Sequence, residues 1–291
     1  MSARCVEEVL TAGRGARVFS ILTLPEPSTT IRAVFVFLNA GLVHRVGPSR
    51  MNVRLARKLA AAGFASVRVD LSGKGDTPAR PDVDYLDSVT EDFADLHAAI
   101  RNRLGNLPLV LAGLCSGADN AVRLALANET VVGMLLLDPM CYPDADYRRW
   151  SLIDRYLRWQ QYSGKLRMFL SRQRSKSAES EAGGTTGQDD PLKLRVLPSI
   201  EDTANAVQAV DGRNGATLAI FSNYASSYYK HRGQFAATTY QAAFSTRSQE
   251  LWWRGVKHTY KSLTHVERLE NTVLSWASAL AEPSRGDTAA P

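Results

Sequence analysis

One stretch of the sequence decides the fold: Leu109-Val110-Leu111-Ala112-Gly113-Leu114-Cys115-Ser116-Gly117-Ala118-Asp119-Asn120-Ala121-Val122. Its first half is a short apolar run, and its second half is compatible with the start of a helix. This order predicts a buried strand, one sharp turn and a helix. Gly113 and Gly117 permit a tight turn and a close approach of neighbouring backbone. We therefore expect Cys115, which lies between them, to stand at the carboxyl edge of a sheet.

The residues around Cys115 match the frame of the Gly-x-Ser-x-Gly nucleophile elbow, which presents its central side chain at that edge. In this chain the central residue is a cysteine, and the serine, Ser116, follows it. The positive end of the helix dipole favours a thiolate at this place. The sequence therefore predicts Cys115 as a nucleophile.

Strands and helices alternate along most of the chain. Two short segments near the N-terminus, 4–12 and 16–24, predict an antiparallel hairpin at a sheet edge. Further apolar runs predict strands at 33–38, 64–71, 109–114, 131–137, 216–222 and 249–254. Amphipathic segments predict helices at 50–62, 85–104 and 263–281. This alternation predicts an α/β fold with a mostly parallel, doubly wound sheet.

The alternation lapses over residues 143–206. Aromatic and basic residues at roughly helical spacing predict helical structure across 147–173. The segment 175–190 has so few apolar side chains that we expect it to be mobile. An insertion after the carboxyl end of a strand lies above the expected site, so we interpret it as a helical cap or lid. The predicted organisation is a core domain in two parts, 1–142 and 207–291, with a cap insertion at 143–206.

A histidine and an aspartate each follow a predicted strand. His258 comes directly after the last strand, at the same sheet edge as Cys115, where it can act as a general base. The turn after the penultimate strand, 221–231, contains no carboxylate. Asp138, at the end of the strand before it, is therefore the best candidate for the acid that orients His258. The weaker alternates are Asp144 and Asp146.

Acyl chemistry also needs N–H donors aimed at the oxyanion that develops on the substrate. The turn places the backbone N–H of Ser116 for this role, and we expect a second donor, the N–H of Leu42, from the loop after strand 33–38. His44 lies in the same loop, and the sequence leaves open whether it lines the pocket or is an ordinary loop residue. The histidines never pair at metal-ligand spacing and Gly73-Lys74-Gly75 is no phosphate loop, so we expect no metal and no cofactor.

The charge of the chain is uneven. Thirty-five Lys and Arg against 29 Asp and Glu give a net charge of +6, and residues 147–176 hold nine basic residues and one acidic residue. This basic segment is either a solvated helix face or a docking surface for an acidic partner, such as a carrier protein or the phosphates of coenzyme A. No nucleic-acid-binding motif accompanies it.

The expected compartment is the cytoplasm. The sequence has no apolar run of eighteen residues, so we expect no membrane span. The N-terminus lacks the apolar region of a signal peptide. The three cysteines, Cys5, Cys115 and Cys141, form no even disulfide set and no metal spacing.

Four motifs stand in a characteristic order: Phe37-Leu-Asn-Ala-Gly-Leu42, Arg68-Val-Asp-Leu-Ser-Gly-Lys-Gly-Asp76, Gly113-Leu-Cys-Ser-Gly117 and Val256-Lys-His-Thr-Tyr260. With them the chain resembles the α/β-hydrolase superfamily over nearly its whole length. The Gly-Leu-Cys motif and the loop 39–48 are similar to hydrolases associated with exosortase systems. The cysteine is similar to that of dienelactone hydrolases, and the position of the acid to that of thioesterase domains of peptide and polyketide synthases. The resemblance implies an α/β-hydrolase fold with Cys115 as nucleophile, His258 as base and Asp138 as acid.

These features lead to one main hypothesis and two alternatives. The main hypothesis is a cysteine-dependent acyl-transfer enzyme, a thioesterase or an acyltransferase or cyclase. Its substrate would be an acyl thioester on a carrier protein or coenzyme A, because thioester exchange onto Cys115 is nearly isoenergetic. One alternative is a carboxylesterase or lactonase of the dienelactone-hydrolase type. The other is a catalytically silent binding protein with a hydrolase fold.

Overall fold

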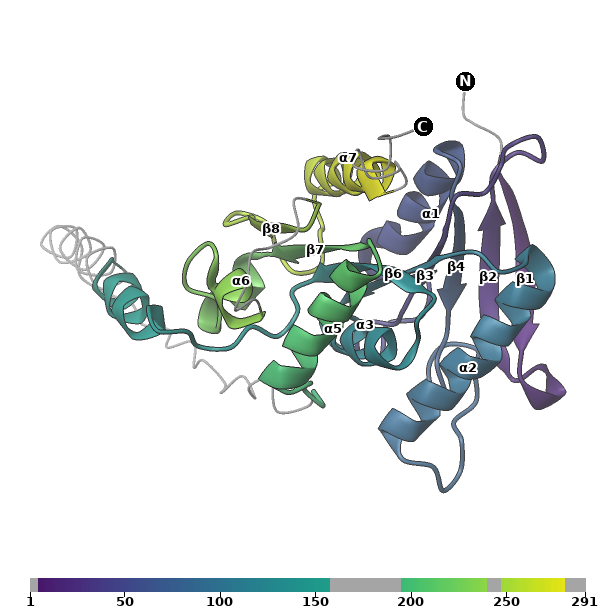
Figure 1. Ribbon diagram of the computed structural model, residues 1–291, viewed down its shortest axis with the longest axis horizontal. Helices are drawn as coiled ribbons and strands as arrows, with labels where there is room; N and C mark the ends of the chain where they lie inside the picture. Colours follow the sequence, from purple (N-terminus) through teal and green to yellow (C-terminus); the bar gives the residue numbers. More distant parts are fainter. Residues whose placement is uncertain (1–4, 158–194, 240–246, 281–291) are drawn as a thin grey trace, which may run out of the picture.

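The computed structural model describes residues 5–157, 195–239 and 247–280, which form an eight-stranded sheet with helices on both faces (Figure 1). The strands follow the order β1-β2-β4-β3-β5-β6-β7-β8. Their bounds are β1 Val6–Ala12, β2 Val18–Leu24, β3 Val34–Phe37, β4 Ala65–Val69, β5 Leu109–Leu114, β6 Val131–Leu137, β7 Ala216–Phe221 and β8 Gln249–Trp252. The predicted α/β fold with a mostly parallel sheet is confirmed.

The direction of the strands places several loops at one edge. β1 and β2 form the predicted antiparallel edge hairpin, and β2 also runs antiparallel to β4. The other six strands are parallel to one another. Every residue of β3, β4, β5 and β7 is buried, as expected of parallel strands covered on both faces. Because these strands are parallel, the loops that follow them meet at the same edge of the sheet.

Two groups of helices cover the two faces of the sheet (Figure 1). One face carries α2 (Tyr85–Leu104), α3 (Ser116–Ala127) and α5 (Ile200–Gly212), and the other carries α1 (Met51–Ala61) and α7 (Leu263–Leu280). On the second face Trp276 of α7 meets Phe35 of β3 edge-on, with ring centroids 6.4 Å apart. Burial of each such side chain contributes about 1.5–3 kcal/mol, so the helices hold the sheet rigidly.

Helix α5 lies in a region to which the sequence assigned no helix. It begins with a capping box, in which Ser199 Oγ accepts from the Asp202 N–H at 2.9 Å and the Asp202 carboxylate accepts from the Ser199 N–H at 3.2 Å. Its buried residues, Val207 and Val210 among them, belong to the core layer that α3 also joins. The predicted end of the cap insertion, at residue 206, therefore falls inside a helix that packs on the sheet. The capping box was the available sequence signal.

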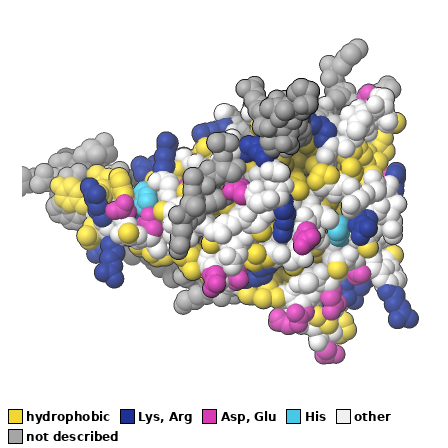
Figure 2. Space-filling model, viewed as in Figure 1, with side chains coloured by type: hydrophobic (Ala, Val, Ile, Leu, Met, Phe, Trp, Pro, Cys, Tyr) yellow, Lys and Arg dark blue, Asp and Glu magenta, His cyan; other side chains and the backbone are white. Residues whose placement is uncertain are grey.

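The described start of the predicted cap is a helix over residues 147–157 that projects from the body of the molecule (Figure 1). Figure 2 shows hydrophobic and basic side chains side by side at this end of the molecule. The exposed apolar side chains of the helix are those of Trp150, Leu152, Ile153, Tyr156 and Leu157. The rest of the basic segment and the predicted mobile segment 175–190 lie outside the described residues. Within the described part of the chain, no helix is both long and apolar enough to cross a membrane.

Candidate active site

Cys115 forms the turn between β5 and α3 by itself. Its φ of 57° and ψ of −120° are a conformation that L side chains rarely adopt. Its N–H donates to the Leu137 carbonyl of β6 at 2.8 Å, which holds the turn. A Cβ at Gly113 would lie 2.1 Å from the Gly117 backbone, and a Cβ at Gly117 would lie 2.7 Å from the Asn39 carbonyl oxygen. Both glycines are therefore required for this turn to close.

Asp138 lies at the end of β6, fully buried (0% exposed), and its carboxylate accepts three hydrogen bonds. Ser222, the residue after β7, donates its N–H to Asp138 Oδ1 and its Oγ–H to Oδ2, both at 2.6 Å. His258, in the loop after β8, donates Nδ1–H to Asp138 Oδ2 at 2.6 Å. The structure thus brings His258 and Asp138 together, and Ser222 occupies the turn in which the sequence offers no carboxylate.

His258 is held between an acid and a thiol. Burial alone would lower its pKa, but the hydrogen bonds and charges of Asp138 and Cys115 raise the pKa of His258 to about 9. The ring of Tyr224 stacks on the imidazole, with centroids 4.0 Å apart and planes 27° apart. Burial, and then the neighbouring Cys115, raise the pKa of the Tyr224 hydroxyl. At neutral pH the imidazole is therefore protonated, with the Cys115 side chain beside it.

Two backbone donors border Cys115. Ser116 is the first residue of α3, so no residue within the helix can accept from its N–H. The Ser116 hydroxyl accepts from the Gly41 N–H at 2.8 Å, which ties the loop after β3 to the turn. Leu42 follows directly; its side chain is 88% exposed, and among the described residues no acceptor pairs with its N–H. Leu42 and Ser116 thus line the same cleft as Cys115, and among the described residues neither backbone N–H has an acceptor.

A buried polar network fixes the loop that carries Leu42. Asp70, at the end of β4, accepts from the Arg45 N–H at 2.6 Å and from Asn39 Nδ2 at 3.1 Å. The Arg45 guanidinium pairs with Asp70 and, at 2.6 Å, with Asp76. Asn39 Oδ1 in turn accepts from the Leu71 N–H at 2.8 Å. The position of the loop relative to the sheet edge is therefore set by charge-assisted hydrogen bonds.

Arg195, which the sequence analysis did not single out, lines the same cleft as Cys115. Its Nε and Nη2 bind the two carboxylate oxygens of Asp119 in α3 at 2.8 Å and 2.7 Å, and its side chain is only 4% exposed. Burial would lower the pKa of Arg195, but the charges of Asp119 and Cys115 raise it. Asp119 would by itself oppose a thiolate at the start of α3, and Arg195 compensates its charge.

These residues open into a cleft of about 700 Å³. Cys115, His258 and Tyr224 line it together with Arg195. Three further lining residues come from the loop after β4, from α2 and from α3: Lys74, Tyr85 and Asn120. The only hint of this group in the sequence is Gly73-Lys74-Gly75, which places a lysine in the loop after a predicted strand.

Three residues named from the sequence lie away from the cleft. His44 is exposed and does not line it, because Arg45 is anchored inward on Asp70 and the His44 ring turns back to accept from the Val46 N–H at 3.4 Å. The two alternate acids do not pair with His258 either. Asp144 pairs with His231 at 3.0 Å, and the backbone carbonyl of Asp146 accepts from the Trp150 N–H at the start of the projecting helix. Of the three candidate acids, Asp138 alone contacts His258 among the described residues.

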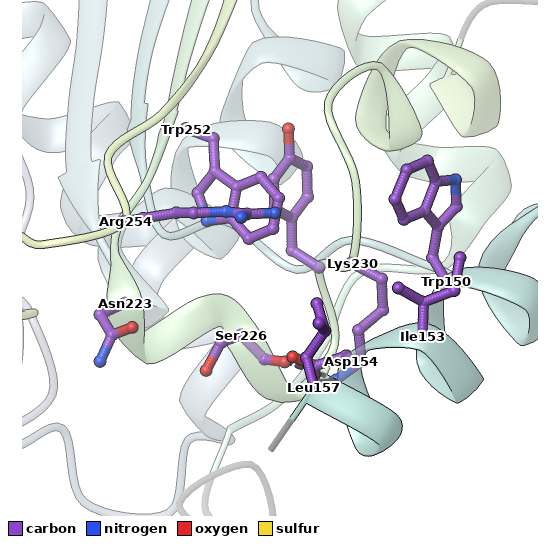
Figure 3. Close-up of a pocket in the computed structure, with 10 residues that line it drawn as sticks. Trp150, Ile153, Asp154, Leu157, Asn223, Ser226, Lys230, Trp252 and Arg254 are labelled. Carbon is purple, nitrogen blue, oxygen red and sulfur yellow. Dashed lines mark hydrogen bonds and ion pairs between the residues drawn. The ribbon is translucent and has the colours of Figure 1, made fainter. Parts of the chain in front are cut away.

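A second cavity, of about 490 Å³, lies between the projecting helix and the loops after β7 and β8 (Figure 3). Arg254 stacks on Trp252 at one side, with the guanidinium carbon 3.9 Å from the ring centroid, and Trp150 lies at the other side. Asn223 and Ser226 line it, whereas Tyr224 between them lines the cleft. This cavity contains none of the thiol, imidazole and carboxylate groups described above, so we assign the site to the cleft.

The reactive groups of the cleft are those of a nucleophile and an acid–base pair. In the described ranges, no group of three or more His, Cys, Asp or Glu side chains is placed to hold a metal ion. Cys5 and Cys141 are free thiols outside the cleft. Cys141 is buried, and burial raises its pKa well above the ordinary value of a thiol.

Comparison with known protein families and structures also points to a hydrolase fold. A family model described as "Serine aminopeptidase, S33" matches residues 35–258. No curated protein sequence matches the chain. Among solved structures, a dienelactone hydrolase from Anabaena variabilis superposes with a TM-score of 0.56 at 12% identity, covering 95% of this chain and 98% of that one.

Two further structures have the same fold. A thermostable carboxyl esterase from Bacillus coagulans gives a TM-score of 0.58 at 14% identity, over 96% of this chain and 99% of its own. A member of the α/β serine hydrolases without a lid, from Xanthomonas campestris, gives 0.53 at 13% identity, over 98% of both chains. At these identities the similarity shows the α/β-hydrolase fold, which was the predicted fold class.

Proposed function

This chain belongs to the serine aminopeptidase S33 family of α/β-hydrolase-fold proteins, and from that premise we propose that it hydrolyses carboxylic esters or lactones through an acyl-Cys115 intermediate. The observation that carries the proposal is the contact of His258 with Asp138 at 2.6 Å on one side and with Cys115 on the other. A thiol beside an oriented histidine is an arrangement for nucleophilic catalysis. The dienelactone hydrolase and the carboxyl esterase that share the fold support an ester or lactone substrate.

Acylation begins from a pair of ions in this proposal. The nucleophile in this proposal is a Cys115 thiolate beside the His258 imidazolium, which persists at neutral pH because the pKa of His258 is raised to about 9. The sulfur attacks the acyl carbon, a C–S bond forms, and the carbonyl oxygen becomes an oxyanion that the N–H groups of Ser116 and Leu42 can stabilise. The oxyanion then collapses, the bond from the acyl carbon to the ester oxygen breaks, and His258 gives its proton to the departing alkoxide.

Deacylation reverses the roles of the same groups. The acylated sulfur carries no charge, so His258 loses one of the two partners that raise its pKa and more readily takes the neutral form that a general base requires. It takes a proton from water, and the hydroxide attacks the acyl carbon. The C–S bond then breaks, and the free acid leaves while the imidazolium and the thiolate are restored. Asp138 fixes the orientation of the ring throughout.

Acyl transfer from a thioester is the second candidate, and the identity of the nucleophile favours it. Transfer of an acyl group from a thioester to the Cys115 thiol exchanges one thioester for another and costs little free energy. Attack of the thiol on an oxoester instead produces a thioester, which is more reactive than the ester consumed. The acceptor in that case is an alcohol or an amine in place of water. The fold neighbours include a dienelactone hydrolase and a carboxyl esterase, so we rank this hypothesis second.

Intact-protein mass spectrometry and turnover assays together test the proposal. The wild type is incubated with short p-nitrophenyl esters, small lactones and acyl thioesters of N-acetylcysteamine, alongside the variants Cys115→Ala and Cys5→Ala. Cys5 is a free, half-buried thiol outside the cleft, so its variant controls for chemical acylation of any cysteine. We expect one added acyl group in the wild type and in Cys5→Ala, and none in Cys115→Ala.

The decay of the adduct separates the candidates. An adduct from an ester that decays in water alone supports hydrolysis. An adduct formed from thioesters alone, which persists until an alcohol or amine is added, supports transfer. Turnover that is unchanged in Cys115→Ala would overturn the acyl-cysteine mechanism and point to another nucleophile, such as the adjacent Ser116. No adduct and no turnover with any of these compounds would also overturn it and leave a binding protein with a hydrolase fold.

A further inference from the structure

A cluster of hydrogen-bond donors without acceptors lies in the cleft apart from the catalytic groups. Lys74 is only 8% exposed, and its Nζ donates to the Tyr85 hydroxyl oxygen at 3.2 Å. The same ammonium stands 4.9 Å from the centroid of the Tyr85 ring. Asn120 Nδ2 donates to the same hydroxyl oxygen at 2.9 Å. All three side chains line the cleft that contains Cys115.

The hydrogens of this cluster outnumber its acceptors. The Tyr85 oxygen accepts two hydrogen bonds, so its own O–H hydrogen points to a third place. A lysine ammonium has three hydrogens, and one of those on Lys74 is used here. The Asn120 amide keeps a second N–H. The cluster therefore offers several N–H and O–H groups and one positive charge to whatever occupies this part of the cleft.

Lys74 also differs from the other cations of the cleft in having no carboxylate. Arg195 is bound by both oxygens of Asp119, and His258 is bound by Asp138. Within the described part of the chain, Lys74 makes no ion pair. An ammonium taken out of water without a counter-ion is costly, and natural structures keep such a group where a ligand completes it.

The order of the strands says which part of the substrate this cluster meets. Lys74 follows β4 and His258 follows β8, and these strands lie on opposite sides of β5, which carries Cys115. The departing alcohol must lie near His258, because it takes its proton there. The cluster on the other side of the sulfur therefore faces the acyl group. One positive charge with two neutral donors suits a carboxylate, which has one negative charge and two oxygens.

We infer that Lys74, Tyr85 and Asn120 form a carboxylate-binding site, and that the substrates are half-esters or lactones whose acyl part carries a free carboxylate. That the substrate is an ester or lactone rests on the proposed function. That it carries a carboxylate rests on the Lys74, Tyr85 and Asn120 cluster alone. Charge-assisted hydrogen bonds are about twice as strong as neutral ones, so loss of the ammonium should reduce selectivity about 10- to 100-fold.

Matched substrates test the inference in the wild-type enzyme and in Lys74→Met, which removes the charge and keeps the stem of the side chain. The substrates are p-nitrophenyl hemisuccinate, hemiglutarate and hemiadipate, each beside its neutral methyl-capped counterpart. The readout is the ratio of kcat/KM for the charged over the neutral ester. We expect the wild type to prefer a charged ester at least about tenfold and Lys74→Met to lose that preference. Lys58→Met, at an exposed position of α1, should keep it.

Two results would overturn the site. One is a wild-type ratio near one while Cys115 is still acylated by the neutral esters, which leaves the proposed function standing. The other is an equal loss on both esters in Lys74→Met. If no compound acylates Cys115, the proposed function fails. The carboxylate-binding site is then tested separately, by calorimetric titration with monomethyl glutarate. The site is supported if monomethyl glutarate binds to Cys115→Ala and no longer binds to the Cys115→Ala, Lys74→Met double variant. It is refuted if both variants bind the compound equally or if neither binds it.

Discussion

Replacing His258 by Gln tests the electrostatic centre of the site without any knowledge of the substrate. The pKa of His258 is raised from 6.5 to about 9, because Asp138 and Cys115 outweigh the effect of burial. A group whose pKa is higher in the folded than in the unfolded state stabilises the fold fully below the unfolded pKa, and this stability is lost as the pH rises through the folded pKa. At about 1.4 kcal/mol for each pH unit, the contribution of His258 is about 3 kcal/mol.

The measurement is the free energy of unfolding by urea at about pH 6 and about pH 9.5, on either side of the two pKa values. The wild type should lose about 3 kcal/mol more than His258→Gln between these conditions, because only the wild type releases the proton from His258. Groups remote from the cleft titrate equally in both proteins, so the difference reports His258 together with the groups that contact it. His44→Gln removes an exposed imidazole remote from the cleft and should follow the wild type. An equal loss in the wild type and His258→Gln would refute the placement of His258 between the carboxylate and the thiol.

Three further substitutions test the elements that support the site. Ser222→Ala removes the Oγ donor to Asp138 at 2.6 Å and keeps the N–H donor, so kcat should fall about tenfold with little change in KM, and an unchanged kcat would contradict the role of Ser222. Gly113→Ala would place a Cβ 2.1 Å from the Gly117 backbone, so thermal unfolding should show a loss of about 3 kcal/mol or more, and a wild-type Tm would refute the steric argument. Arg195→Met leaves Asp119 buried without a cation, so the free energy of unfolding by urea should fall by about 3–5 kcal/mol at neutral pH. The loss should become smaller under acid conditions, where Asp119 can be protonated, and a loss independent of pH would count against the ion pair.

Sequence reasoning reached Cys115, His258 and Asp138 because their positions follow from topology alone. Each comes directly after a predicted strand or in the loop behind it, and parallel strands bring their carboxyl ends to one edge. The contact between His258 and Asp138 spans 120 residues of sequence, yet the register of β6, β7 and β8 fixes it. The glycines around Cys115 gave the turn, since the elbow has no room for a Cβ at either position.

Residues whose contacts depend on the path of a loop could not be found in this way. Arg195 reaches Asp119 across 76 residues of sequence, and it lies in no described strand or helix whose register would predict that contact. Tyr224 stacks on His258 because the short helical turn after β7 aims its ring inward while its neighbours face the second cavity. The case of His44 is the opposite: a loop histidine near the site turns out to solvent because its neighbour Arg45 is anchored on Asp70. The order of the strands determines which loops lie next to each other. Which side chains of those loops point into the cleft depends on side-chain packing, which the sequence pattern does not give.

The charges of the cleft connect the nucleophile with the proposed substrate. A thiolate at Cys115 would repel a carboxylated acyl group unless each negative charge had its own cation, and the structure separates the two: His258 stands beside the sulfur, and Lys74 lies on the other side of it. Acylation removes the charge of the sulfur and lowers the pKa of His258, whereas the ammonium of Lys74 is unaffected by that step. The acyl group would therefore stay anchored by its carboxylate while His258 turns from acid to base. If so, Lys74→Met should slow the hydrolysis of the preformed acyl-Cys115 as well as its formation, because the same contact holds the acyl carbon against the two N–H donors in both steps.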